Sequence, residues 1–324
     1  MDLFYLGIDI SKSKFDVALL LDGSRLHHRV FLNSAAGFQH LSTWLSKRNV
    51  QHVHACMEAT GAYGEALALY LHNAGHTVSV VNPSIIKAFA STEMSRTKTD
   101  KSDSSLIARY CLKHQPQAWA PPSPEISELQ ALLRRLEALI EMRQQEANRQ
   151  AAGLQAESVK KSVTDHIGYL DYQIAHTQSL IRDHIDQNPS LKQQRDLLSS
   201  IPGIGDLTAA KLLSEFVDIS KYSSARQAAA FAGLVPRHNN SGSSVRGRPR
   251  LCKVGTARLR KALYFPAIVA TQHNPVIRAF SEKLRQRGKC PMVIIGAAMR
   301  KLIHIAYGVL KSGKPFDAGY GKTA

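Results

Sequence analysis

The chain opens with residues 3–32, LFYLGIDISKSKFDVALLLDGSRLHHRVFL, and this stretch decides the fold that we predict. Leu3–Ile10 is mostly apolar, and Lys14–Leu21 alternates apolar with polar side chains. After the turn residues Asp22-Gly23-Ser24, a third run covers Arg25–Leu32. Runs of this length, separated by turn residues, are typical of β-strands. The opening therefore predicts three consecutive strands that begin a sheet.

Helical and strand patterns alternate from there to about Gln115. Phe38, Leu41 and Leu45 have helical spacing behind Ser34, which is a suitable N-cap. Strands are predicted at 53–57 and 76–81, and further helices at 63–74, 83–90 and 101–113. Alternation of this kind indicates an α/β domain, a mixed sheet flanked by helices, over residues 1–115.

A proline-rich segment, 115–124, predicts an extended linker. Two long segments with apolar residues three and four apart follow it, the first with Ile126, Leu129, Leu133, Leu136 and Ile140 and the second with Val163, Ile167, Leu170, Ile174, Ile181 and Ile185. This spacing predicts a helical hairpin or coiled coil within residues 116–190. It is either a spacer that packs only on itself or a dimerisation arm. Residues 191–324 are predicted to form a mainly helical domain.

Positive charge is concentrated near the C-terminus. The chain has a formal net charge of +17. The stretch from Arg237 to Lys314 contains 17 Lys and Arg but one acid, Glu282, and so carries +16 of that charge. A block of one sign indicates a polyanionic partner. Basic membrane-binding proteins share this charge, but an Arg/Gly/Ser-rich loop and carboxylates upstream favour nucleic acid.

The remaining composition indicates a cytoplasmic protein that does not enter a membrane. We find no apolar run of the length of a membrane span and no charged-then-apolar leader. The four cysteines, Cys56, Cys111, Cys252 and Cys290, form no CxxC pair and no cluster with histidine. A structural zinc site is therefore not expected, and the thiols suit a reducing compartment.

Four carboxylates indicate a shared metal site. Asp9 lies near the end of the first strand, and Glu58 directly follows the strand at 53–57. Asp100 and Asp103 are three residues apart at a helix start, so they share one side of that helix. If the first and fourth strands are neighbours, all four acids can converge. Magnesium or manganese prefers such oxygen ligands, and two ions about 3.5–4 Å apart can clamp a phosphoryl transfer.

Each acid alone is more often structural than catalytic. An aspartate after a strand is commonly a turn residue, and acids at a helix start complement the helix dipole. Four acids in this strand–strand–helix order favour the metal site. A Gly-Ile-Asp strand also opens the actin-like sugar kinases, but the chain has no convincing Gly-rich adenosine signature. The basic C-terminal block also fits a kinase poorly.

Residues 197–211 predict a helix-hairpin-helix. Gly203 and Gly205 permit a tight turn whose amides open the next helix, and such amides bind a phosphate oxygen without reading the base. The alternative is an ordinary corner between helices. Together with the basic residues downstream, the nucleic-acid contacts that we expect are Gly203, Gly205, Arg237, Arg246, Arg248, Arg250, Lys253, Arg258, Arg260 and Lys261.

The run Arg237–Arg250 is rich in Asn, Ser, Gly and Arg, and we predict a flexible polar loop. It either grips phosphate through its arginines or carries a nucleophilic serine. A serine hydroxyl needs a base, a metal or strong electrostatic help, and His238 is close in sequence. Composition leaves Ser241, Ser243 and Ser244 open.

The chain resembles a known family over nearly its whole length. The matching motifs are Gly7-Ile8-Asp9, Glu58-Ala59-Thr60-Gly61, Lys98-Thr99-Asp100 with Asp103, Ile201-Pro202-Gly203-Ile204-Gly205, Ala230-Phe231-Ala232-Gly233-Leu234, Ser241-Gly242-Ser243-Ser244-Val245-Arg246-Gly247, Met299-Arg300-Lys301-Leu302 and Tyr307-Gly308-Val309-Leu310-Lys311. They are similar to those of the bridge-RNA-guided insertion-sequence transposases, relatives of the pilin-inversion recombinase. That family pairs a RuvC-like DEDD domain with a C-terminal transposase domain.

The resemblance implies a ribonuclease-H-like (RuvC-like) fold for the first domain and magnesium bound by Asp9, Glu58, Asp100 and Asp103. It makes Ser241 the nucleophile of a transesterification that holds a DNA strand covalently. It also implies a structured guide RNA from the element's flanks that pairs with donor and target DNA, so that base pairing selects the sites. One departure is Ser104, where the family pattern has alanine; we expect no effect on metal ligation.

The leading hypothesis is thus an RNA-guided DNA recombinase that acts as a homo-oligomer, in which one subunit's serine could complete a neighbour's carboxylate site. The alternative is a metal-dependent Holliday-junction or RNA:DNA nuclease that uses water as the nucleophile. A third hypothesis is a nucleic-acid-binding protein without catalysis.

Overall fold

The computed structural model describes residues 4–21, 25–59, 61–93, 99–153, 156–241 and 245–319; of Ala62 and of the hairpin residues 238–241 and 245–249 it describes the backbone alone. The chain divides into two compact units, Met1–Pro121 and Pro122–Ala324. Each unit is described by itself.

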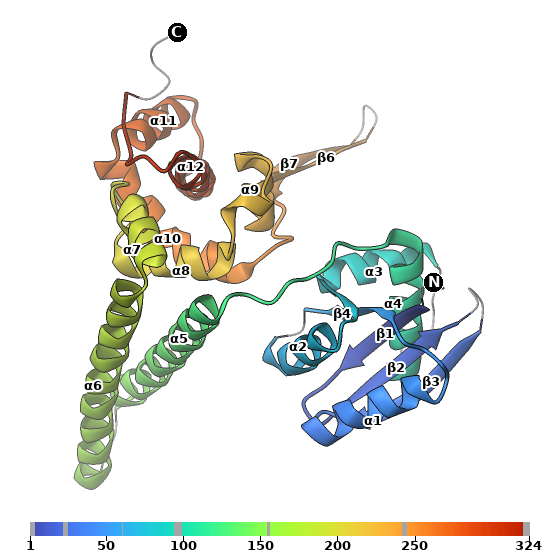
Figure 1. Cartoon of the computed structure of the whole chain (residues 1–324). Helices are drawn as coiled ribbons and strands as arrows, with labels where there is room; N and C mark the ends of the chain where they lie inside the picture. The colour runs from blue at the N-terminus through green and yellow to red at the C-terminus, as the bar shows by residue number, and fades with distance from the viewer. Residues whose placement is uncertain are drawn as a thin grey trace. The chain divides into compact units, whose positions relative to one another are not determined.

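The first unit contains a five-stranded sheet with the strand order β3-β2-β1-β4-β5 (Figure 1). Its first three strands, β1 (Phe4–Ile10), β2 (Lys14–Leu20) and β3 (Leu26–Leu32), pair antiparallel, as the opening sequence predicts. The strands β4 (Val53–Glu58) and β5 (Thr77–Val81) continue the sheet in parallel with β1. The mixed sheet and the β1–β4 neighbourhood are therefore confirmed.

Four helices surround this sheet: α1 (Ala35–Ser46), α2 (Glu65–Asn73), α3 (Pro83–Thr92) and α4 (Asp100–His114), with a short 3₁₀ turn at Ala62–Gly64 before α2. The Ser34 hydroxyl accepts a hydrogen bond from the Gly37 amide, which confirms the predicted N-cap. The α/β character of residues 1–115 agrees with the prediction, and helix boundaries differ from it by a few residues.

Side chains alternate between two cores on opposite faces of the sheet. Leu6, Ile8 and Met57 pack in the core that includes residues of α1 and α2. Tyr5 and Cys56 belong to the other core, which includes residues of α3 and α4. Because successive side chains of a strand point to opposite faces, odd-numbered residues of β1 and even-numbered residues of β4 face α4.

The linker between the units is extended, as predicted, and its first half is attached to the edge of the sheet. The Trp119 amide donates a hydrogen bond of 2.6 Å to the carbonyl oxygen of Val78. The Ser79 hydroxyl donates to the carbonyl oxygens of Pro116 and Gln117, each at 2.9 Å. These bonds satisfy one backbone carbonyl of β5 and two of the linker, and they tie this part of the linker to the first unit.

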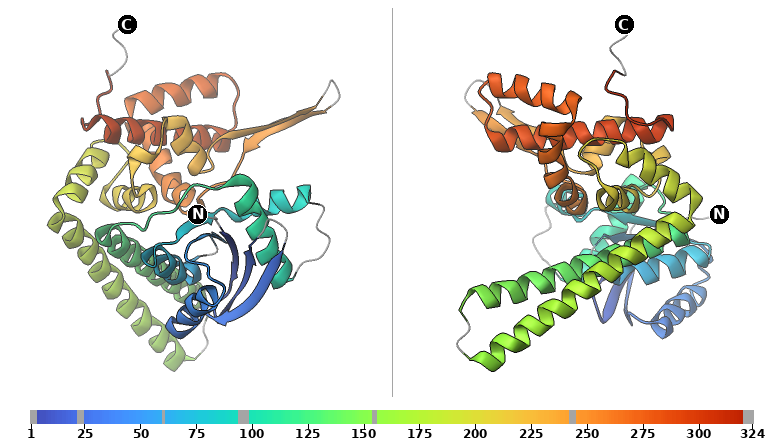
Figure 2. Two further views of the ribbon diagram at one scale, coloured as in Figure 1. Left: turned by 45° about the vertical axis from the view of Figure 1, so that its right-hand side comes forward. Right: turned by 90° about the vertical axis from the view of Figure 1, so that its left-hand side faces the viewer.

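The second unit begins with two long helices, α5 (Pro124–Ala151) and α6 (Glu157–Gln187), which run side by side (Figure 2). The predicted helical hairpin is confirmed, with one correction to its seam. Leu139 is 1% exposed, whereas Ile140 is 40% exposed. The buried residues Leu133, Leu136 and Leu139 are spaced three apart. The buried face of α5 therefore continues through Leu139 and not through Ile140.

The base of this hairpin does not pack only on itself. Leu129, Leu133 and Ile181 belong to one core with Leu212 and Leu213 of α8 (Asp206–Phe216). The Gln130 side chain also donates a hydrogen bond of 2.8 Å to the Ser214 carbonyl oxygen. The base of the hairpin therefore packs on the rest of the second unit, and the hairpin is not a spacer that packs only on itself. Its role in dimerisation stays a prediction.

The rest of the second unit consists of helices around one core and a two-stranded sheet, as follows: α7 (Pro189–Ser199), α8 (Asp206–Phe216), a 3₁₀ turn (Ile219–Lys221), α9 (Ala225–Phe231), β6 (Pro236–Ser241), β7 (Val245–Leu251), α10 (Ala257–His273), α11 (Pro275–Gln286) and α12 (Pro291–Ser312). The mainly helical character predicted for residues 191–324 is confirmed.

Helix α12 corrects one statement made from the sequence. By length and composition it is apolar enough to cross a membrane, so an apolar run of that length does exist. Its residues Ala298, Leu302 and Ile303 are 0% exposed and belong to the core of the second unit. This burial is typical of the central helix of a folded domain, and the apolar composition of α12 serves that packing.

Candidate functional site

Three acids lie on the face of the sheet that α4 covers. The parallel register pairs Ile8 of β1 with Met57 of β4, and one residue further along each strand come Asp9 and Glu58. On the other side of β1, Asp9 pairs directly with Asp16 of β2. By the alternation described above, all three side chains are on the α4 side. The prediction that strand ends bring Asp9 and Glu58 together therefore agrees with the register.

Helix α4 brings the other two acids to this face. Its N-terminus is fixed by a capping box, in which the Thr99 hydroxyl accepts from the Ser102 amide and the Ser102 hydroxyl accepts from the Thr99 amide. Asp100 and Asp103 both lie in the first turn that this box holds. The cap therefore fixes the backbone from which the two carboxylates project.

A glycine sets how closely α4 approaches the sheet. A Cβ atom at Gly7 would collide with the Ser104 carbonyl oxygen and with the backbone of Ala108. Only glycine permits this contact, which lies two residues before Asp9. Ser104, the one departure from the family pattern, is 0% exposed, and its hydroxyl donates to the Lys101 carbonyl oxygen at 3.2 Å. It is thus accommodated within the helix, and the expectation that it does not affect metal ligation stays a prediction.

The electrostatics of Asp9 show that these acids are near one another. The pKa of Asp9 is raised to about 6, first by burial and then by the negative charges of Asp103, Asp100 and Asp16. Lys14 acts in the opposite direction. A carboxyl group in such surroundings favours its neutral form unless a cation compensates the charge.

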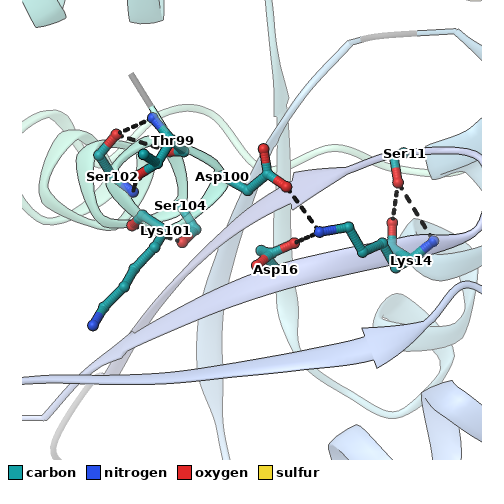
Figure 3. Close-up of polar contacts among 8 residues, drawn as sticks. All are labelled: Ser11, Lys14, Asp16, Thr99, Asp100, Lys101, Ser102 and Ser104. Carbon is teal, nitrogen blue, oxygen red and sulfur yellow. Dashed lines mark hydrogen bonds and ion pairs between the residues drawn. The ribbon is translucent and has the colours of Figure 1, made fainter. Parts of the chain in front are cut away.

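Lys14 supplies part of that compensation in this structure (Figure 3). Its Nζ atom lies 2.8 Å from Oδ2 of Asp100 and 3.3 Å from Oδ2 of Asp16. The hydrogen bond with Lys14 holds the pKa of Asp100 below its ordinary value. The cluster thus consists of acids from β1, β2 and α4 with a lysine ammonium between two of them.

The oxygen donors suit a hard divalent cation, which would offset the negative charge gathered around Asp9. However, the structure does not bring them into ligating geometry: over the described ranges, no group of three or more His, Cys, Asp or Glu side chains could hold a metal ion as they stand. The residues therefore fit a metal by chemistry and by sheet face, and ligation requires their side chains to move.

The sequence analysis missed Asp16 and Lys14. Both lie on the second strand, and the length of the connection between the first two strands could have indicated their position. A three-residue connection, Ser11–Ser13, joins the first two strands, so Ile10 pairs with Phe15 and Asp9 with Asp16. Counting this register from the hairpin would place Asp16 beside Asp9 on one face of the sheet.

The predicted serine loop is a β-hairpin, which corrects the expectation of a flexible loop. Strands β6 and β7 pair antiparallel, with Ser241 opposite Val245 and a register shift between Arg237 and Asn239 (Figure 1). Backbone pairing stabilises this polar stretch without an apolar core. Pro249 is tolerated because a two-stranded sheet has only edge strands.

Of the candidate nucleophiles, the structure describes the backbone of Ser241 alone. Ser241 is the last residue of β6, and its backbone alone is described. Ser243 and Ser244 lie outside the described residues, and so do the side chains of His238, Arg246 and Arg248. The hairpin therefore places the Ser241 backbone without testing the choice among the three serines.

The region predicted as a helix-hairpin-helix consists of α7, a tight turn and α8, an arrangement that an ordinary corner between helices shares. Gly203 has φ +104°, which favours glycine, and a Cβ there would lie 2.9 Å from the Pro266 carbonyl oxygen of α10. Gly205 is the N-cap of α8 and makes no side-chain cap. Asp206 follows it and accepts a hydrogen bond from the Ser199 hydroxyl at 3.0 Å. Gly203 thus has a packing role, and Asp206 puts an acid at the predicted phosphate site.

The predicted basic contacts differ in how they are placed. Arg237, Arg250 and Lys253 are exposed. The exposed Arg258 and Lys261 lie 3.9 Å from Glu215 and 3.5 Å from Glu141. Arg260 is half-buried, and its Nη1 atom donates to the carbonyl oxygens of Ala232, Gly255 and Thr256. That arginine already joins two backbone segments, one at Ala232 and one at Gly255–Thr256.

Comparison with known proteins agrees with this arrangement. Residues 6–157 match a family described as transposase, the DEDD domain of the IS110 group, and residues 195–282 match the transposase IS116/IS110/IS902 family. The pilin gene-inverting proteins of Moraxella lacunata and Moraxella bovis are each 37% identical over 320 residues, 98% of both chains. The transposase for insertion sequence element IS1111A of Coxiella burnetii is 24% identical, covering 75% of this chain and 71% of its own.

The fold, the acids and these matches define a DNA transposase/recombinase, an enzyme that acts on DNA. The chain belongs to the IS116/IS110/IS902 family of transposases. A DEDD transposase domain indicates the use of a divalent metal ion, in agreement with the carboxylates at the first turn of α4. An actin-like kinase and a non-catalytic binding protein are thereby excluded.

Proposed function

We propose that this transposase is an RNA-guided DNA recombinase that cuts and rejoins donor and target DNA through a covalent serine–DNA intermediate. The observation that carries the proposal is the placement of Asp9 and Glu58 at neighbouring strand ends, on the face that the first turn of α4 covers. We propose that this first domain, residues 1–115, has a ribonuclease-H-like fold, for which the mixed five-stranded sheet is suitable.

In this proposal Asp9, Glu58, Asp100 and Asp103 hold Mg²⁺, with Mn²⁺ as a possible substitute. The bound ions would neutralise charge on the reacting phosphate and orient it for in-line displacement. The chain's own contribution is the placement of the ligands: the capping box fixes the backbone of Asp100 and Asp103, and Gly7 lets α4 approach the sheet.

Ser241 is the proposed nucleophile. Its hydroxyl oxygen attacks a DNA phosphorus atom, a new Oγ–P bond forms, and the bond from phosphorus to a sugar oxygen breaks. The serine's proton leaves, and the departing sugar oxygen gains a proton as it becomes a hydroxyl. In the second step a hydroxyl of another strand attacks the same phosphorus and loses its proton. The Oγ–P bond breaks, and the serine oxygen regains a proton. The number of ester bonds is unchanged, so rejoining requires no ATP.

The partners follow from the charge distribution and the family resemblance. The basic block from Arg237 to Lys314 suits the phosphate backbones of donor DNA, target DNA and a structured guide RNA. We propose that pairing with this RNA from the element's flanks selects both DNA sites, with the protein binding backbone and shape. Among the predicted contacts whose side chains the structure describes, the exposed Arg237, Arg250 and Lys253 are the most available for phosphate.

Bringing two DNA duplexes together requires several active sites, so we propose a homo-oligomer. The α5–α6 hairpin in residues 116–190 is the proposed assembly arm between the catalytic domain and the transposase domain at 191–324. In such an assembly Ser241 of one subunit could complete the acid site of another. Its place of action is the cytoplasm, where its DNA substrates lie.

Strand transfer by the purified protein tests this proposal. Protein, RNA from the element's flanks, Mg²⁺ and labelled donor and target duplexes are combined, and products are run on a denaturing gel with and without protease. We expect a protease-sensitive protein–DNA adduct and joined strands. Both are lost in Ser241→Ala and in Asp9→Ala, while Ser243→Ala, a serine two residues away, retains them.

The alternative is a metal-dependent nuclease for Holliday junctions or RNA:DNA hybrids, with water as the nucleophile. It predicts nicks without an adduct, which Ser241→Ala leaves unaffected and Asp9→Ala abolishes. That outcome would overturn the serine mechanism and leave the acid site in place. Omitting the RNA tests guidance separately, because joining at unchanged sites without RNA would contradict it.

A further inference from the structure

Lys14 joins two carboxylates that come from different parts of the fold. The lysine and Asp16 lie on strand β2, whereas Asp100 is the first residue of α4 (Figure 3). The ammonium nitrogen is 2.8 Å from the Asp100 carboxylate and 3.3 Å from that of Asp16. The Asp16 side chain is 12% exposed and the Asp100 side chain 58% exposed. Lys14 thus connects a largely buried acid with an exposed one.

A positive charge is needed at this place when no metal is bound. Asp9 and Asp16 are directly opposite across β1 and β2, and like charges in that relation destabilise a sheet. Asp100 and Asp103 add negative charge next to Asp9. Lys14 lowers this repulsion from within the cluster, and its hydrogen bonds to Asp100 and Asp16 raise its own pKa, which keeps it charged.

We propose that Lys14 is a positioning residue that takes the place of the metal's positive charge in the metal-free protein and releases Asp100 when a divalent cation binds. The inference rests on the proposed function, because it requires Asp100 to be a metal ligand. Asp16 is not exchanged in this scheme. It remains the partner of Lys14 and keeps the ammonium at the border of the site.

The exchange is physically reasonable for this pair. The Oδ2 oxygen of Asp100 accepts a hydrogen bond from Lys14. The lone pair used in that bond cannot bind a metal ion at the same time. Lys14 is 43% exposed, so its ammonium is partly solvated already, and exposed ion pairs contribute little to stability. A divalent cation with several carboxylate ligands can therefore displace it. The carboxylates must move for a metal ion to bind, because among the described residues their present positions do not form a group of metal ligands.

The first test is Mn²⁺ binding to the full chain, measured by the electron paramagnetic resonance signal of the free ion. Lys14→Gln removes the competing ammonium, and we expect it to bind Mn²⁺ more tightly, by roughly 3- to 10-fold given the screening of a nearby unit charge. Lys12→Gln is the matched control. Lys12 is an exposed lysine two residues away, and we expect a change within about 2-fold.

The second test follows Lys14 itself. Brief acylation of surface amines, read out by peptide mass spectrometry, compares Lys14 with Lys12 in the same protein. In the metal-free state the two carboxylates protect Lys14, so we expect its reactivity relative to Lys12 to rise when Mn²⁺ is added. Asp100→Asn removes one partner, and we expect Lys14 to be reactive there with or without the metal.

The outcomes separate this inference from the proposed function. If Mn²⁺ binding is lost in Asp9→Asn but Lys14→Gln binds no more tightly than the wild type, the metal site stands and the exchange is wrong. A Lys14 reactivity that stays equal or falls on adding Mn²⁺ would overturn the exchange in the same way. If Asp9→Asn and Asp100→Asn both bind Mn²⁺ like the wild type, the proposed metal site fails and the role of Lys14 fails with it.

Discussion

The carbonyl oxygen of Ser104 on α4 occupies the space into which a Cβ atom of Gly7 on β1 would project. This contact brings the helix directly onto the strand, one residue from Asp103 and two from Asp9. The distance between helix and sheet therefore controls the spacing of the acids.

Gly7→Ala is expected to destabilise the protein and to weaken metal binding together, because the added methyl must push α4 away from the sheet. Overpacking of this kind costs about 1–3 kcal/mol, which urea unfolding monitored by circular dichroism will measure. Gly64→Ala is the control. A Cβ there would lie at ordinary contact distance, 3.5 Å from the Met57 sulfur, and we expect a smaller loss.

The contribution of Asp9 to the stability of the metal-free protein is expected to fall as the pH rises from about 4 to about 6. The pKa of Asp9 is about 6 in the folded protein against an ordinary value of 3.8, so in this range the unfolded chain loses a proton that the folded one keeps. The contribution of Asp9 is then fully unfavourable above pH 6. Urea unfolding in the presence of a chelator, at half-unit pH steps, measures the slope.

Asp9→Asn should reduce this slope and stabilise the metal-free protein at pH 7 by about 1 kcal/mol, a value discounted for solvent screening. Asp165→Asn, at an exposed acid of α6, should leave the slope unchanged. An Asp9→Asn protein that keeps the wild-type slope would show that Asp9 is not the group responsible.

Arg250→Ala is expected to weaken DNA binding about equally for all sequences and to lower the magnitude of the salt-dependence slope of log K by about 1, since each phosphate contact releases about one counterion. Arg250 is exposed near the base of the β6–β7 hairpin. Fluorescence anisotropy over a range of salt concentrations measures both quantities. Lys192→Ala on α7, outside the basic block, should change neither, and an equal effect there would argue against a local contact.

The two seam positions of α5 are expected to respond differently to truncation. Leu136→Ala creates a cavity at a fully buried site and should cost about 2–5 kcal/mol. Ile140→Ala removes a side chain that is 40% exposed and should cost less than about 1 kcal/mol. Thermal and urea unfolding of the full chain compare them. Equal losses would contradict the placement of the seam at Leu139.

Much of the first unit could be predicted because its signals are local. The three opening strands, the Ser34 cap and the helical start at Asp100 are each set by a few neighbouring residues, and the structure agrees with them. The four acids were predicted to lie near one another from their positions at the ends of these elements, and their role as metal ligands stays a prediction. Asp16 was not predicted because its place beside Asp9 depends on the register between two strands. The pattern of residues within one strand does not determine that register.

The errors in the second unit have a common cause, which is that tertiary packing overrides composition. The polar stretch from Arg237 to Arg250 has the composition of a loop, but backbone pairing makes it a hairpin. The seam of α5 passes through Leu139 because the neighbouring helix determines which apolar side chain is buried. Arg260 counts as a basic residue in the sequence, while in the fold its guanidinium binds backbone carbonyls.

The most direct test of the central claim is to locate the covalent bond between protein and DNA. The adduct formed in a strand-transfer reaction with Mg²⁺ is digested with protease and nuclease, and the peptides are sequenced by mass spectrometry. The account predicts a residual nucleotide, joined through its phosphate to Ser241. A phosphate attached to Ser243, to Ser244 or to another residue, or the absence of any such peptide while strands are still cut, would contradict it.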